Sequence, residues 1–112
     1  MLPEGELWWQ PHSGALSVGT ILMHLEGNVR QWILSGVGSE PDARERAREF
    51  SNDHREEASG ERTELLDRLQ ATTRAAAELL ASLTEDSLQK DLAIQGFEVT
   101  GLEAIYHVVE HF

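Results

Sequence analysis

The chain has 112 residues, 40% of them hydrophobic and 26% charged, as is usual for one small domain with a single core. Twenty Asp and Glu residues against nine Lys and Arg residues give a net charge of -11, which disfavours binding to nucleic acids and to anionic membranes. Because there is no cysteine, disulfides, thiolate metal ligands and a protein thiol nucleophile are excluded.

The N-terminus lacks the pattern of a signal peptide, and no apolar run approaches the length of a membrane span. We therefore expect one cytoplasmic domain over residues 1–112. Residues 1–16 contain two of the three prolines and the pair Trp8-Trp9. They predict an irregular lead-in whose tryptophans cap an edge of the core, with an aromatic binding surface as the alternative.

The first predicted helix covers residues 17–34, with Ser17 as its N-cap and Gly36 as its stop signal. Its apolar residues recur at helical spacing and form one stripe. A second, narrower stripe is polar, which indicates either a water-filled cleft within the bundle or a face exposed to solvent. The polar stripe consists of Thr20, His24, Asn28 and Gln31.

Regular patterning stops between residues 36 and 60, and a connection of this length typically forms a functional lid or a linker. We expect Phe50 to anchor this segment and His54 to be exposed. Its clustered arginines are interpreted as local partners of nearby carboxylates, not as a basic patch.

The second predicted helix covers residues 61–83, and its leucines and alanines indicate scaffold without chemistry. A polar stretch without regular structure is expected to follow. The third helix begins with the capping box Thr100-Gly-Leu-Glu103 and continues to Phe112.

The third helix carries His107 and His111, which are four residues apart and therefore project from one face about one turn apart. Two such imidazoles can bind one divalent metal, and His24 can add a third ligand from a neighbouring helix. Three protein ligands leave an open coordination position, as in catalytic sites. The competing interpretation is that these are surface or partly buried histidines, a common use of this spacing.

Three segments resemble the DinB/YfiT-like superfamily, and together they extend over most of the chain. The resemblance implies an all-α four-helix bundle, often with a divalent metal held by three histidines. It also implies transfer or isomerisation reactions that use a low-molecular-weight thiol. The segments are Leu7-Trp-Trp-Gln-Pro11, the run from Ser17 to Ile33, and Thr100-Gly-Leu-Glu-Ala-Ile-Tyr-His-Val-Val-Glu-His111.

By this resemblance, His24 matches the ligand of the first-helix segment and His111 matches the first histidine of the last-helix pair. The third ligand of the superfamily would fall one turn beyond His111. Either the sequence is incomplete at its C-terminus, or the third position is vacant, or His107 substitutes for it. We expect the bundle to lack most of its first helix and the end of its last helix.

The leading hypothesis is a metal-dependent transferase that acts on a small molecule with a low-molecular-weight thiol. Nitrogen and oxygen ligands suit Zn or Ni best, with Fe or Mn as alternatives. We expect Trp32, Tyr106 and Asn28 to shape the substrate cleft, which the segment 36–60 would cover.

The alternative is a non-catalytic helical module with a vestigial metal site. Three amphipathic helices leave an apolar face without a partner, which predicts a homodimer. The residues expected on that uncovered face are Trp8, Trp9, Trp32 and Phe112.

Overall fold

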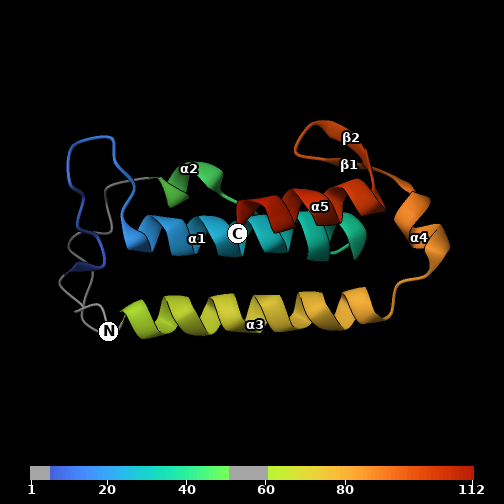
Figure 1. Cartoon of the computed structure of the whole chain (residues 1–112), viewed down its shortest axis with the longest axis horizontal. Helices are drawn as coiled ribbons and strands as arrows, with labels where there is room; N and C mark the ends of the chain where they lie inside the picture. The colour runs from blue at the N-terminus through green and yellow to red at the C-terminus, as the bar shows by residue number, and fades with distance from the viewer. Residues whose placement is uncertain (1–5, 51–60) are drawn as a thin grey trace.

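The computed structural model describes residues 6–50 and 61–112 (Figure 1). The first helical layer is α1 (Val18–Val29), which continues as the π-helix η2 (Arg30–Val37). Helix α3 (Glu61–Ala81) runs beside it in the same direction, and α5 (Gly101–His111) packs against η2 in the opposite direction (Figure 1). None of the helices in the described ranges is long and apolar enough to cross a membrane.

The first helix begins as predicted but ends later. Ser17 is its N-cap, and the Ser17 hydroxyl accepts a hydrogen bond from the Thr20 N–H at 3.1 Å. The prediction that Gly36 stops the helix is wrong, because π-type hydrogen bonds carry the helical backbone on to Val37. A Cβ atom at Gly36 would lie 2.3 Å from Ile94 Cδ1, so the absent side chain makes room for the packing of Ile94.

The segment after the first helix is not wholly irregular, since it contains the short helix α2 (Arg46–Glu49). Phe50 is 41% exposed and contacts the His24 ring at a centroid distance of 5.4 Å, so it joins the segment to α1 at the surface and is not a core residue. The buried residue of α2 is Glu49. The remainder of the predicted loop, including His54, lies outside the described residues.

The expected polar stretch after α3 instead forms the helix α4 (Glu85–Gln89) and a hairpin of β1 (Asp91–Ile94) and β2 (Phe97–Thr100). Thr84 caps α4 by accepting a hydrogen bond from the Ser87 N–H. Gln95 and Gly96 connect the strands with φ angles of 51° and 81°, the positive values that tight hairpin turns require. The all-α prediction is confirmed in part: the described residues are mainly helical, with one two-stranded antiparallel sheet.

Helix α5 begins with the predicted capping box. The Thr100 hydroxyl accepts from the Glu103 N–H, and the Glu103 carboxylate accepts from the Thr100 N–H, at 3.2 and 3.0 Å. This confirms the start of the third predicted helix.

The core lies where η2, α3, α5 and the hairpin meet, and its buried members are mostly aliphatic. Trp32 is 2% exposed, so the expectation that it lies on an uncovered surface is wrong. Trp8 is half-buried against Gly19, whereas Trp9 and Phe112 are exposed. The cluster comprises Val29, Trp32, Ile33, Leu34, Ala76, Ile94, Ala104 and Val108.

A buried polar contact joins α1 to α3. The Thr72 hydroxyl donates to Glu26 Oε1 at 2.8 Å and accepts from Arg30 Nη2 at 2.9 Å. Arg30 Nε also donates to Glu26 Oε1 at 2.9 Å, so one threonine links both members of an ion pair on the neighbouring helix.

We predict that Thr72→Val lowers the free energy of unfolding by about 1–3 kcal/mol, because the buried Glu26 carboxylate loses the hydroxyl donor of Thr72 and Arg30 loses the acceptor for its Nη2 atom. Chemical denaturation monitored by circular dichroism measures this loss. Thr73→Val is the matched control, since the Thr73 hydroxyl bonds only to backbone carbonyls of its own helix. Equal effects of the two substitutions would contradict the prediction.

Candidate functional site

Three histidine rings gather where α1 meets the C-terminal part of α5. The ring centroids of His24 and His111 are 5.3 Å apart, and those of His107 and His111 are 4.6 Å apart. Helix packing therefore brings His24, from the polar stripe of α1, next to the pair on α5.

The His24 ring is held by an ion pair from the segment that follows η2. Its Nδ1 atom lies 3.2 Å from Glu49 Oε1 and 3.3 Å from Arg44 Nη2. Arg44 binds Glu49 through two parallel hydrogen bonds, Nε to Oε2 at 2.8 Å and Nη2 to Oε1 at 2.9 Å. The side chains of Arg44 and Glu49 are only 4% and 6% exposed, so the pair is shielded from water.

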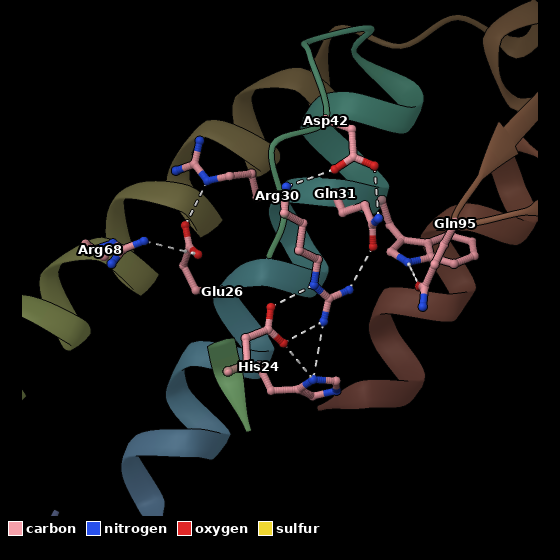
Figure 2. Close-up of polar contacts among 10 residues, drawn as sticks. His24, Glu26, Arg30, Gln31, Asp42, Arg68 and Gln95 are labelled. Carbon is pink, nitrogen blue, oxygen red and sulfur yellow. Dashed lines mark hydrogen bonds and ion pairs between the residues drawn. The ribbon is translucent and has the colours of Figure 1, made fainter. Parts of the chain in front are cut away.

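The ion pair belongs to a longer polar network (Figure 2). Arg44 Nη1 donates to Gln31 Oε1 at 2.8 Å, and Gln31 Nε2 donates to Asp42 Oδ2 at 3.0 Å. The hydrogen bond from Gln31 lowers the pKa of Asp42, and the backbone N–H of Arg44 lowers it further. A charged carboxylate thus closes the end of the network that is remote from His24.

His111 is exposed, and the hydrogen bond of its Nδ1 atom fixes the tautomer of the ring. Its Nδ1 atom lies 2.8 Å from the His107 carbonyl oxygen, which can only accept a hydrogen bond. Nδ1 of His111 therefore carries a proton, and in the neutral ring Nε2 keeps its lone pair.

His107 is stacked face to face on Trp32, with ring centroids 3.7 Å apart. The Trp32 indole N–H donates to Gln95 Oε1 of the hairpin turn at 3.4 Å, and Phe97 packs near the same ring. A cleft of about 350 Å³ opens beside this stack, and Tyr106 is among its walls. The cleft is lined by Trp32, Phe97, Val99, Glu103, Tyr106, His107 and Glu110.

Two of the three residues predicted to shape the cleft, Trp32 and Tyr106, line it. Asn28 does not: it lies on α1 between His24 and Trp32 and is 1% exposed. Its Oδ1 atom is buried and accepts no hydrogen bond from any described residue.

The residues at this site fit a divalent ion at two ligand positions. Imidazole nitrogen is a good ligand for such ions, and His24 and His111 supply two rings close together. Across residues 6–50 and 61–112, however, no three or more His, Cys, Asp or Glu side chains are grouped to hold a metal ion. The His107 ring, which is stacked on Trp32, does not complete such a group.

A family model described as "Protein of unknown function (DUF1572)" matches residues 1–112. The chain belongs to the DUF1572 family. No curated protein and no solved structure matches it.

The sequence alone did not single out Arg44 and Glu49, which lie within a run of alternating charges. Pairing of its arginines with nearby carboxylates was predicted and is confirmed for these two residues. Their contact with His24 was not predicted, because nothing in the local pattern distinguishes a buried glutamate from its solvated neighbours. The sequence did point to Gln31, because Gln31 lies on the same polar stripe of the first predicted helix as His24.

Burial lowers the pKa of His24 below its ordinary value, with Arg44 and His111 acting in the same direction against Glu49. Burial and the charge of His111 likewise lower the pKa of His107, against Glu110. The folded state thus favours neutral rings, whereas the unfolded chain binds protons near pH 6.5. Stability is then fully present above that pH and is lost as the pH falls through the lowered values.

We predict that the free energy of unfolding of the metal-free protein decreases between about pH 7.5 and about pH 5.5. Denaturation curves in the presence of a chelator measure this change. The double variant His24→Gln/His107→Gln should flatten the dependence. His12→Gln should leave it unchanged, because His12 is exposed and contacts only its own loop. A wild-type stability that is constant over this range would refute the prediction.

Proposed function

We propose that this chain binds a divalent metal ion through His24 and His111 and acts on a small molecule in the adjoining cleft. The observation that carries the proposal is the 5.3 Å separation of two imidazole rings that come from opposite ends of the chain. The Nδ1 hydrogen bond of His111 supports it, because it leaves Nε2 of that ring available as a ligand.

The reaction class that we propose is group transfer with a low-molecular-weight thiol, as the resemblance to the DinB/YfiT-like superfamily implies. The chain has no cysteine, so the thiol would have to be a separate molecule. A bound Zn²⁺ or Ni²⁺ ion supplies Lewis-acid activation of such a thiol.

The residues of the chain have separate tasks in this proposal. His24 and His111 would hold the ion, while His107, stacked on Trp32, lies next to His111 and lines the aromatic cleft. The exposed rings of Phe97 and Tyr106 offer apolar surface to the part of the substrate that does not react.

We predict that zinc raises the melting temperature of the wild-type protein, by an amount equivalent to about 2.7 kcal/mol when zinc is 100-fold above its Kd. His24→Ala and His111→Ala should abolish the shift. The shift should also decline below about pH 6.5, because protonated imidazole cannot bind a metal. Differential scanning fluorimetry on protein purified without a metal-affinity tag measures all three effects.

His12→Ala is the matched control and should retain the full shift, because His12 lies on the exposed lead-in. A wild-type protein whose melting temperature responds to neither zinc nor chelator between pH 7 and pH 8 would rule out the proposed metal site.

The second candidate function is a non-catalytic module that forms a homodimer. Leu102, Tyr106 and Val109 recur at helical spacing on α5 and are exposed, and Phe112 continues this apolar surface. A contiguous apolar surface favours an interface, and a two-fold axis would let each copy cover the other.

If the dimer forms, light scattering at micromolar concentration will give twice the mass of 12.5 kDa, and the melting temperature will rise with protein concentration. Val109→Asp should yield monomers, because it places a charge on the proposed interface. Leu66→Asp is the control, since Leu66 is an exposed leucine of α3. A wild-type monomer with a concentration-independent melting temperature would exclude this candidate.

A further inference from the structure

The Nδ1 atom of His24 lies between two groups, one of which requires a proton on Nδ1 and the other a bare Nδ1. It is 3.2 Å from the carboxylate of Glu49 and 3.3 Å from the guanidinium of Arg44. An Nδ1–H group can donate to the carboxylate, whereas a bare Nδ1 can only accept from the guanidinium. In the neutral ring, the first arrangement leaves a lone pair on Nε2, and the second places the proton there.

The other hydrogen bonds of the ion pair favour donation from His24 to Glu49. Arg44 already directs three N–H groups to Glu49 and Gln31 at 2.8–2.9 Å, all shorter than its contact with His24. Glu49 Oε1 accepts one of these bonds, and a carboxylate oxygen has a second lone pair. A buried negative acceptor also strengthens a hydrogen bond from a ring N–H.

We propose that Glu49 is a positioning residue: it accepts the Nδ1–H of His24 and so reserves Nε2 of that ring for a metal ion. This inference rests on the proposed metal site but assigns Glu49 no contact with the ion. His111 reaches the same tautomer through the His107 carbonyl, so both rings present Nε2. Arg44, held by Gln31 and Asp42, keeps the Glu49 carboxylate in place (Figure 2).

Glu26, a carboxylate on the helix that carries His24, provides a matched control for Glu49. Glu26 lies two residues from His24 in α1 and is as buried as Glu49, with exposed fractions of 7% and 5%. It also pairs with an arginine, Arg30, but none of its hydrogen bonds or ion pairs involves His24. Glu26→Gln therefore removes a comparable buried charge without changing the partner of the His24 ring.

The decisive measurement is nitrogen-15 NMR of the histidine rings in the metal-free wild-type protein at pH 8, which reports the tautomer without any substitution. We expect the proton of His24 on Nδ1 in the wild type and in Glu26→Gln, and a shift of the population toward Nε2–H in Glu49→Gln. A wild-type His24 with its proton on Nε2 would overturn the proposal, whether or not the variants fold.

Zinc affinity provides the second readout and is measured by competition with a chromophoric chelator. Glu49→Gln should weaken zinc binding by about 10- to 100-fold, the usual effect of losing the carboxylate partner of a metal-binding histidine. Glu26→Gln should bind zinc like the wild type. Unchanged affinity and an unchanged tautomer in a folded Glu49→Gln variant would overturn the proposal. If neither the wild type nor the variants bind zinc, the proposed metal site is wrong. The tautomer of His24 in the wild type still decides whether Glu49 accepts its Nδ1–H.

Discussion

The ion pair between Arg44 and Glu49 lies at the centre of the polar network that orients His24. Both side chains are almost fully buried, and they link the segment after η2 to α1 through His24 and to η2 through Gln31. Charges withdrawn from water are tolerated only when they are paired and hydrogen-bonded, and removal of one partner of such a pair costs about 3–5 kcal/mol. The segment therefore has one favourable position on α1, and the His24 ring is oriented by the same contact.

Helix α1 uses two opposite faces for polar contacts of different kinds. Glu26 faces α3, where Thr72 and Arg30 satisfy its carboxylate. His24 faces α2 and α5, where it meets Glu49 and His111. The first set joins two helices of the scaffold. The second lies next to the His107–Trp32 stack, which is part of the lining of the aromatic cleft.

The three long helices were predictable because their signals are local. The Ser17 cap, the capping box of Thr100 and Glu103, and the apolar repeat of the second helix all depend on residues within a few turns of one another. The hairpin was missed although Gln95-Gly96 separates the two strands, because Gln-Gly is a weaker turn signal than Asn-Gly. The extension through η2 was missed because Gly36 is tolerated where Ile94 fills the space beside it.

By itself, the sequence determined that the chain is mainly helical, that His107 and His111 share one face of a helix, and that His24 lies on a polar stripe. Helical geometry fixes such relations, because each depends only on the rise and rotation per residue. Only the tertiary structure decided that the ring of His24 meets that of His111, that His107 stacks on Trp32, and that Glu49 contacts His24. These contacts join residues 25 or more positions apart, and they form because packing of the core and burial of paired charges select one arrangement of the helices.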